Sequence, residues 1–334
     1  MARKIKDREV RWGVIGVGDV CEVKSAPAMN VVEDSRLVAV MRRNAELAED
    51  YAARHDVPTW YSDANDLIND PNVNAIYIAT PPNAHRDLAL AAAAAGKPVY
   101  VEKPMARTHA ECLEMITACS EANVPLYVAY YRRTLPHFLG VRELLAAGEI
   151  GDVRHVQITL NQEPEPEVVR NLDNNWRVDP DIAGGGYFYD LASHQFDLLD
   201  FLLGPIASAS GFAANQAGLY AAEDIVTATW QFESGVLGTG SWCFAASAAS
   251  KQDATVIIGN KGQISFETFG AGRFRVQTED RDELFDYELP RHIQEFLIRN
   301  IVDDLLGRGT SPSTGESGAR TNRIMEAICT SKGS

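Results

Sequence analysis

The sequence predicts an α/β protein in which a doubly wound parallel sheet is followed by an α+β domain with an open, mostly antiparallel sheet. In the first part, near-continuous apolar runs alternate with helical segments, which is typical of a parallel sheet covered on both faces. Glycines follow the first of these runs directly. In the second part, apolar and polar residues alternate between glycine-containing turns, which indicates antiparallel strands. The length of 334 residues fits two domains, and we expect them to span 1–130 and 131–334.

The expected elements of the first domain alternate between strand and helix. The segment His85–Lys97 is rich in alanine, the best helix former, and Gly96 is placed to end that helix. Thr108 is a suitable N-cap for a helical segment that runs to Asn123, and a further helical segment is Ala45–His55. The apolar runs that predict the strands are Val10–Ile15, Leu37–Val40, Ala75–Ala79, Val99–Val101 and Val124–Tyr131.

The second domain is expected to contain one strong helix among its strands. This helix covers Tyr187–Leu203 and is stopped by Gly204-Pro205. A final amphipathic helix, at about His292–Leu306, could pack back on the first domain. The alternating segments that predict strands are Val153–Leu160, Asp224–Ser234, Gly235–Phe244, Ala254–Glu267 and Arg273–Glu279.

The composition argues against several classes of protein. The net charge is −15, so we expect no basic face for nucleic acid or for an anionic membrane surface. The five cysteines form no CxxC pair, which argues against a disulfide framework and a zinc site. The histidines show no metal-binding spacing, so no metal is predicted. The charged N-terminus has no apolar signal-like stretch and no run is long enough to span a membrane, so we expect a soluble, cytoplasmic protein.

A glycine-rich turn after the first strand predicts a dinucleotide site. The stretch from Gly16 to Cys21, GVGDVC, fits G-x-G-x-x-G except at its last place, where cysteine is still small. Gly16 and Gly18 permit a tight turn and a close approach of backbone N–H groups to a pyrophosphate. The helix that begins near Asp19 and Val20 would then face the anion. A carboxylate is unexpected beside phosphate, so the Asp19 side chain could instead turn away and cap the helix. The alternative is a glycine-rich turn that binds no ligand.

The residues after the second strand favour NADP over NAD. An acidic residue there would bind the ribose 2′-hydroxyl of NAD, but Arg42 and Arg43 occupy this place. Guanidinium groups pair well with a phosphate dianion, such as the 2′-phosphate of NADP. The alternative is that both arginines are solvated loop charges and that NAD binds without the usual acid.

A second group of polar residues lies on the strong helix of the second domain. Gly184–Gly186, just before it, permits a sharp turn or a close approach to a ligand. Asp190 and His194 are at i and i+4, and Asp197 is three residues further, so all three would share one helix face. A carboxylate and an imidazole there could act as a proton acceptor and the group that orients it, or could bind two hydroxyls. The alternative is an ordinary surface pair.

Taken together, these motifs resemble the Gfo/Idh/MocA oxidoreductases. The match covers nearly the whole chain in order, and it joins a Glu102-Lys103-Pro104 motif to the Asp-x-x-x-His helix. The segments that carry it are Gly16–Gly18, Ala79–His85 (ATPPNAH), Gly96–Ala106 (GKPVYVEKPMA), Tyr130–His137 (YYRRTLPH), Trp176–Gly204 and His292–Arg308.

The resemblance implies roles for individual residues. Lys103 would lie between nicotinamide and substrate, His194 would be the proton acceptor, and Asp190 would hold substrate hydroxyls or tune the site. For His85 the alternative is that it starts a helix and contacts no ligand or other residue. Arg132 is expected to be solvated and to be only a sequence neighbour of Arg133. The further positions that the resemblance assigns to the cofactor are Thr80, Pro81, Asn83, His85 and Glu102, and those near the substrate are Arg133 and Trp176.

The function that the resemblance implies is hydride transfer between nicotinamide and a secondary alcohol or ketone of a sugar, a sugar derivative or a cyclic polyol. NADP is the expected cofactor, with NAD as the alternative. Lys103 would polarise the reacting oxygen and His194 would act as acid and base. Other classes stay open: an oxidoreductase that keeps its dinucleotide and shuttles hydride between two sugars, and a non-catalytic dinucleotide-binding sensor. The open sheet commonly makes oligomer contacts in this family, which implies a homodimer or homotetramer.

Overall fold

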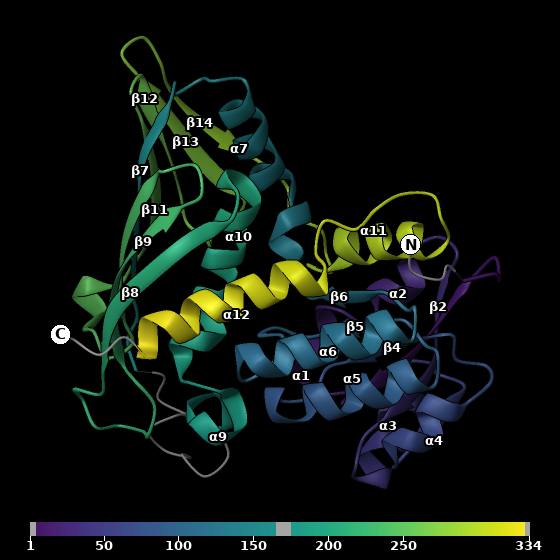
Figure 1. The fold of residues 1–334 in the computed structure, drawn as a ribbon. Coiled ribbons are helices and arrows are strands. Elements are labelled where there is room, and N and C mark those ends of the chain that lie inside the picture. Colours follow the sequence, from purple (N-terminus) through teal and green to yellow (C-terminus); the bar gives the residue numbers. More distant parts are fainter. Residues whose placement is uncertain (1–4, 165–174, 331–334) are drawn as a thin grey trace. The chain divides into compact units, whose positions relative to one another are not determined.

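The computed structural model describes residues 5–164 and 175–330, which fall into two compact units (Figure 1). The first unit comprises the chain up to Tyr131 together with Pro290–Ala319. The second comprises Arg132–Leu289 and the chain from Arg320 onward. Helix α12 (Gly315–Thr330) begins in the first unit and continues in the second, so the C-terminal part of the chain contributes to both.

The first unit contains a parallel sheet of six strands in the order β3-β2-β1-β4-β5-β6. From β1 the strands are added first on one side of the sheet, to β3, and then on the other side, from β4 onward. Doubly wound sheets bind ligands at this switch point between β1 and β4. The predicted doubly wound parallel sheet is therefore confirmed, although β3 was not expected. The strands are β1 (Val10–Ile15), β2 (Ser35–Met41), β3 (Thr59–Tyr61), β4 (Ala75–Ile78), β5 (Val99–Val101) and β6 (Leu126–Val128).

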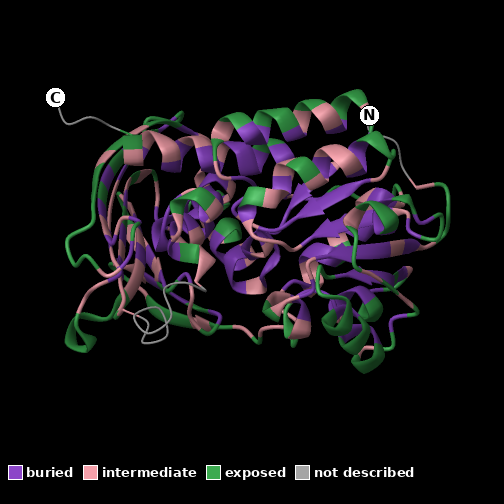
Figure 2. Cartoon of the chain, turned by 90° about the horizontal axis from the view of Figure 1, so that it is seen from below, coloured by how far each residue is buried: buried purple, intermediate pink, exposed green. Residues whose placement is uncertain are grey.

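Helices pack on both faces of this sheet, and their exposed residues lie on the sides away from the buried strands (Figure 2). The buried side chains form two clusters, and successive residues of β4 alternate between them: Tyr77 belongs to one, Ile76 and Ile78 to the other. Helix α11, which comes late in the chain, adds Leu297 and Ile301 to the first cluster. The helices are α1 (Asp19–Val23), α2 (Ala28–Val31), α3 (Ala45–Arg54), α4 (Ala64–Asn69), η1 (Pro82–Ala84), α5 (His85–Ala94), α6 (His109–Glu121) and α11 (Glu295–Leu305).

The second unit contains a sheet of eight strands in the order β14-β13-β12-β11-β7-β10-β9-β8. Among the described strands of this sheet, only β7 and β10 pair in parallel, so the predicted open, mostly antiparallel sheet is confirmed. The strands are β7 (Val153–Asn161), β8 (Ile206–Ala214), β9 (Ile225–Phe232), β10 (Leu237–Cys243), β11 (Gln252–Gly259), β12 (Gly262–Phe266), β13 (Arg273–Thr278) and β14 (Asp282–Asp286).

The strong helix expected over Tyr187–Leu203 is divided in the structure. A π-helical turn, η5 (Phe188–Ala192), precedes α10 (Ser193–Leu203). Such a turn adds a residue to the helical repeat and is frequent at functional sites. The remaining helices that lie in this unit or lead into it are η2 (Tyr131–Thr134), α7 (Pro136–Ala146), η4 (Trp176–Val178), α9 (Pro180–Ala183) and η6 (Ala248–Ser250).

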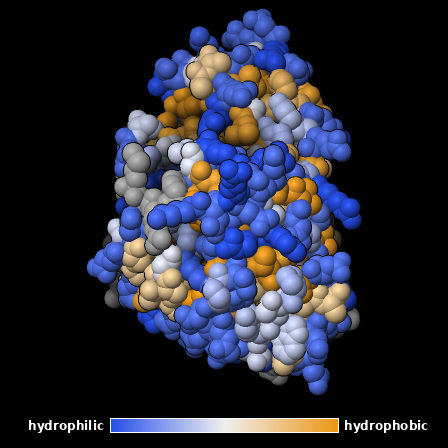
Figure 3. Space-filling view, turned by 90° about the vertical axis from the view of Figure 1, so that its right-hand side faces the viewer, coloured by the Kyte–Doolittle hydropathy of each residue, from blue (hydrophilic) through white to orange (hydrophobic). Residues whose placement is uncertain are grey.

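Hydrophilic side chains cover most of the face shown in Figure 3, with hydrophobic ones in smaller patches between them. Within residues 5–164 and 175–330, no helix is both long and apolar enough to cross a lipid bilayer. In the same ranges, no three side chains of His, Cys, Asp or Glu are grouped to hold a metal ion.

Candidate active site

The glycine turn after β1 packs closely against the residues that follow β4. Gly16 has a φ of +94°, a region that L side chains rarely adopt. A Cβ atom on Gly16 would lie 2.8 Å from Cγ2 of Thr80 and 2.9 Å from its backbone N. A Cβ on Gly18 would approach the described residues no closer than 4.0 Å. Gly16 is therefore fixed by packing, whereas the turn at Gly18 is open.

Helix α1 begins directly after this turn, with Gly18 as its N-cap. Among the described residues no side chain caps it, and Asp19 is exposed, so the alternative in which Asp19 caps the helix is not observed. The first N–H groups of α1 can therefore face an anion. Cys21, in the third glycine place, is fully buried beside Ser25, and burial raises the pKa of its thiol to about 12. The cysteine is thus a small packing residue.

Alanine at the two glycines should affect different properties. Gly16→Ala places a Cβ in the left-handed region and against Thr80, so the free energy of unfolding should fall by about 2–4 kcal/mol. Gly18 has a φ of −124°, which alanine adopts without strain, so Gly18→Ala should change stability by less than about 0.5 kcal/mol. Its methyl group should instead weaken dinucleotide binding. Urea unfolding and dinucleotide titration separate the two effects, and an equal loss of stability in both variants would contradict the assignment.

Arg42 and Arg43 follow β2 and are both exposed. Asn44 then starts α3, and its Oδ1 accepts a hydrogen bond from the N–H of Leu47 at 3.1 Å. Across the described ranges, neither guanidinium forms an ion pair with a carboxylate. Two positive charges are therefore available at the carboxyl end of β2.

His85 lies inside the segment that follows β4. Its ring is fully buried, and burial lowers its pKa. Nε2 lies 2.8 Å from the carbonyl oxygen of Thr80, and Nδ1 lies 3.2 Å from those of Pro104 and Met105. The alternative of a residue that touches nothing is wrong, because the imidazole joins this segment to the one that contains Lys103. The other expected cofactor residues here are half-buried or exposed: Thr80, Pro81 and Asn83.

The buried carboxylate of Glu102 accepts hydrogen bonds from three groups at the end of β5. The hydroxyl of Tyr77 and the side-chain amide of Gln294 donate to Oε1 at 2.6 and 2.7 Å. The backbone N–H of Lys103 donates to Oε2 at 3.1 Å. Gln294, which was not predicted from the sequence, also accepts from the Tyr100 hydroxyl at 2.6 Å. Glu102 therefore holds the backbone of Lys103, whose side chain is half-buried.

The second unit carries the expected acid–base residues on η5 and α10. His194, on α10, has 4% of its surface exposed. Asp190 lies in the π-helical turn and is half-buried, and its Oδ2 is 3.6 Å from Nε of Arg177. The guanidinium of Arg177 lies 4.5 Å over the ring of Trp176. Asp190 and Trp176 therefore belong to one group of side chains.

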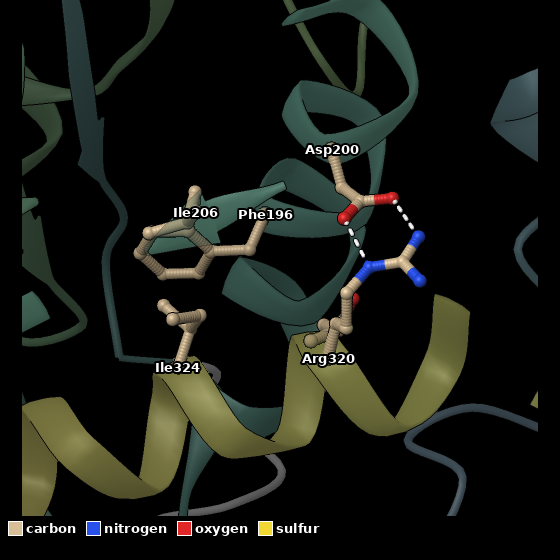
Figure 4. Close-up of a pocket in the computed structure, with 6 residues that line it drawn as sticks. Phe196, Asp200, Ile206, Arg320 and Ile324 are labelled. Atoms are coloured by element: carbon tan, nitrogen blue, oxygen red, sulfur yellow. Dashed lines mark hydrogen bonds and ion pairs between the residues drawn. The ribbon is translucent and has the colours of Figure 1, made fainter. Parts of the chain in front are cut away.

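Arg133 is the centre of a buried ion-pair network. Its guanidinium donates to both carboxylate oxygens of Asp197 at 2.8–3.0 Å, and to Oδ1 of Asp200 at 3.0 Å. Arg320, on α12, donates to both oxygens of Asp200 at 2.7 and 2.8 Å, as the dashed lines in Figure 4 show. Burial opposes ionisation of Asp200, but these two arginines outweigh it and lower its pKa. The pocket of Figure 4 is lined by Phe196, Asp200, Ile206, Arg320, Thr321 and Ile324.

Arg132 is also buried, with 6% of its surface exposed, so the expectation of a solvated side chain is wrong. Its Nε donates to the carbonyl oxygen of Thr268 at 2.9 Å. Burial, together with the charge of Arg132, lowers the pKa of His137 to about 4. The two consecutive arginines of η2 thus have different partners, and both belong to the interior of the second unit.

The two units together define a class of protein. An open glycine turn lies at the switch point of a parallel sheet, as in doubly wound proteins that bind a dinucleotide. The second unit adds a mostly antiparallel sheet and a buried histidine. The chain belongs to the Gfo/Idh/MocA oxidoreductase family. Residues 10–130 match the oxidoreductase family with an NAD-binding Rossmann fold, and residues 138–265 match the GFO/IDH/MocA C-terminal domain.

Relatives of the chain are oxidoreductases. Oxidoreductase P35 of Formosa agariphila is 37% identical over 97% of this chain and 99% of its own length. Myo-inositol 2-dehydrogenase of Thermotoga maritima is 29% identical over 69% of this chain and 67% of its own length. The solved structure of levoglucosan dehydrogenase in complex with NADH and levoglucosan has a TM-score of 0.84 at 24% identity, over 96% of each chain. The structural likeness shows a shared fold, and the sequence relatives confirm the family that the motifs predict.

Proposed function

We propose that this protein is an NAD(P)-dependent oxidoreductase that transfers hydride between nicotinamide and a secondary alcohol or ketone of a sugar, a sugar derivative or a cyclic polyol. One observation carries the proposal: an open glycine turn follows β1 and Lys103 follows β5, so both lie at the carboxyl ends of strands in the parallel sheet. The names of two similar proteins, myo-inositol 2-dehydrogenase and levoglucosan dehydrogenase, support the substrate class.

The residues of the first unit fit a dinucleotide. A pyrophosphate has room at Gly18, and α1 begins there without a side-chain cap among the described residues. Thr80, Pro81 and Asn83 would contact the nicotinamide ribose, and Glu102 would hold the adjacent backbone in place. When bound, the nicotinamide accepts or supplies the hydride.

In this proposal each unit contributes one group to the proton chemistry. Lys103, as an ammonium ion, polarises the substrate oxygen and orients the alcohol. His194 accepts the hydroxyl proton during oxidation and returns it during reduction. Asp190 binds a substrate hydroxyl or tunes the site, and Trp176 lies near the substrate.

A spectrophotometric assay tests this function. The protein is mixed with NADP⁺ or NAD⁺ and a panel of sugars, sugar derivatives and cyclic polyols, and the absorbance of the reduced nicotinamide is followed. We expect at least one compound of the panel to reduce the cofactor. A cofactor that stays bound through purification and is reduced without release would favour a sugar–sugar oxidoreductase. Dinucleotide binding without turnover of any compound would favour a sensor.

We expect Arg42 and Arg43 to give the enzyme a preference for NADP. Replacing both with alanine should raise the KM for NADP⁺ by about 10- to 100-fold, because the 2′-phosphate loses its charged partners. The KM for NAD⁺ should change little. Arg36→Ala is the matched control, because Arg36 is an exposed arginine near the amino end of the same strand. A wild-type preference for NAD⁺ would refute this prediction.

We also propose a cytoplasmic homodimer or homotetramer that forms through the sheet of the second unit. Exposed apolar side chains on its strands support such a contact: Phe212 on β8, Leu237 on β10 and Leu284 on β14 are 71%, 54% and 60% exposed. Light scattering after size-exclusion chromatography measures the subunit number, and a monomer at all concentrations would exclude this assembly.

A further inference from the structure

A phenylalanine outside the sequence motifs lies against His194. The rings of Phe269 and His194 meet edge to face, with 6.1 Å between their centroids and 77° between their planes. Phe269 belongs to the turn between β12 and β13, far from α10 in the sequence, and is half-buried. Edge-to-face packing is attractive because the positive edge of one ring meets the negative face of the other. The contact therefore favours one orientation of the imidazole.

The turn that carries Phe269 is itself held by β11. The backbone N–H of Phe269 donates to Oδ2 of Asp253 at 2.7 Å. The hydroxyl oxygens of Thr268 and Thr255 lie 3.2 Å apart, and both residues are buried. A backbone bond to a carboxylate is a strong, charge-assisted one. These hydrogen bonds fix the backbone position of Phe269.

A buried arginine holds the same turn from a third segment. Arg132, in η2, donates through Nε to the carbonyl oxygen of Thr268 at 2.9 Å. Its guanidinium carbon lies 4.6 Å from the centroid of the Phe269 ring, over the ring face. A cation over an aromatic face is attracted by the ring quadrupole. The ring that contacts His194 is thus held at its backbone and at its face.

We infer that Phe269 is a positioning residue, which holds the His194 imidazole in the orientation that proton transfer requires. This inference rests on the proposed function, in which His194 accepts the substrate proton. An imidazole on α10 can rotate about its side-chain bonds, and a group that transfers protons works only within a narrow range of angles and distances. The turn between β12 and β13 supplies this restraint, with Arg132 and Asp253 as its supports.

The test uses the full-length protein and compares Phe269→Leu with wild type in two measurements. In protein labelled with ¹³C in the histidine rings, one of the seven histidine signals is assigned to His194 by its loss in His194→Gln. This signal should shift in Phe269→Leu, because the ring current of the phenylalanine is lost. With a substrate from the panel, kcat should fall about tenfold, while the KM for the cofactor stays within about twofold. Phe269→Tyr keeps the aromatic ring, so its His194 signal and its kcat should both stay close to those of wild type.

Phe285→Leu is the matched control. The Phe285 ring stacks on Phe274 in the same unit, with 4.6 Å between centroids, so its loss also removes an aromatic contact. It should change neither the His194 signal nor kcat. Phe269→Met keeps most of the side-chain volume without the ring and replaces Phe269→Leu if that variant does not fold.

Two results would overturn the inference: an unmoved His194 signal in Phe269→Leu, or an unchanged kcat in that variant. The first is measured without substrate. If no compound of the panel is turned over, the proposed function fails, and the positioning role fails with it whether or not the signal moves. Turnover by wild type with an unmoved signal removes only the role of Phe269.

Discussion

Replacing His194 with glutamine, or Lys103 with methionine, should lower kcat by about 10²- to 10⁴-fold. Glutamine keeps a polar side chain of similar size but cannot take up a proton near neutral pH. Methionine keeps the length of the lysine stem and removes its charge. Steady-state kinetics on a substrate from the panel measures the loss. Dinucleotide affinity should persist in His194→Gln, because that residue lies in the unit without the glycine turn.

Two control variants separate these effects from a general loss of structure. Lys97→Met removes a lysine just before β5, whereas Lys103 lies just after the same strand. His155→Gln removes a half-buried histidine of the second unit, on β7. Neither control should change kcat more than about twofold. Wild-type turnover in Lys103→Met or in His194→Gln would remove that residue from the mechanism.

The strands that the sequence does not predict are explained by their position in the sheets. The missed strands β3, β8 and β14 are all edge strands. An edge strand is paired on one side only and often carries polar or small residues, so its apolar pattern is weak. Thr59–Tyr61 is short, Ile206–Ala214 reads IASASGFAA, and Asp282–Asp286 reads DELFD. Two strands buried within the parallel sheet, Val10–Ile15 and Val99–Val101, were predicted with their observed bounds.

Helix α12 was missed for a related reason. Its sequence contains Gly315 and Gly318 among polar residues, which weakens a helical pattern. The structure uses these small residues for close packing, since a Cβ on Gly318 would lie 2.7 Å from Cγ2 of Val128. Glycine is required at position 318 because of Val128, which is distant in the sequence, so the local sequence pattern does not show that a helix forms there.

The candidate site divides in the same way. Gly16 and Lys103 stand in motifs whose place after a buried strand can be read locally. Gln294 and Phe269 contact residues that are 192 and 75 positions away in the sequence, Glu102 and His194. Folding alone brings these pairs together, and a single polar or aromatic residue in a turn gives no signal of it. The motifs of the sequence therefore contain the candidate site residues but not the distant side chains that contact them.

Arg133→Met should lower the free energy of unfolding by about 3–5 kcal/mol. The side chains of Arg133 and Asp197 are 5% and 1% exposed, so the variant leaves a buried carboxylate without its main partner. Asp200 keeps its two bonds to Arg320, which limits the loss to one carboxylate. Adding Asp197→Asn should recover part of the stability, because a neutral amide costs less to bury than an unpaired charge. Urea unfolding of the single and double variants measures both effects.

The stability lost in Arg133→Met should depend on pH. Burial raises the pKa of Asp197 to about 6 although Arg133 opposes it, and removing the arginine should raise the pKa further. A carboxyl whose pKa is higher in the folded state than in the unfolded one binds its proton first in the folded state. Stability then rises as pH falls through the folded pKa towards the unfolded value of about 3.9. The difference between wild type and variant should therefore shrink as pH falls towards the wild-type pKa of about 6, and a constant difference would contradict this account.

Variants of Arg133 can distinguish a structural role in this network from the substrate contact that the resemblance implies. Asp197 lies one turn after His194 on α10, so loosening the network should lower kcat together with stability and leave the KM for the substrate unchanged. Arg133→Lys keeps the charge but loses the bidentate hydrogen bonding to Asp197. It should therefore show a smaller loss of kcat and stability, again with an unchanged KM for the substrate. A raised substrate KM with wild-type stability in this variant would instead favour a contact with substrate. Arg275→Met is the control, because the Arg275–Asp282 pair has side chains 52% and 50% exposed and its loss should change little.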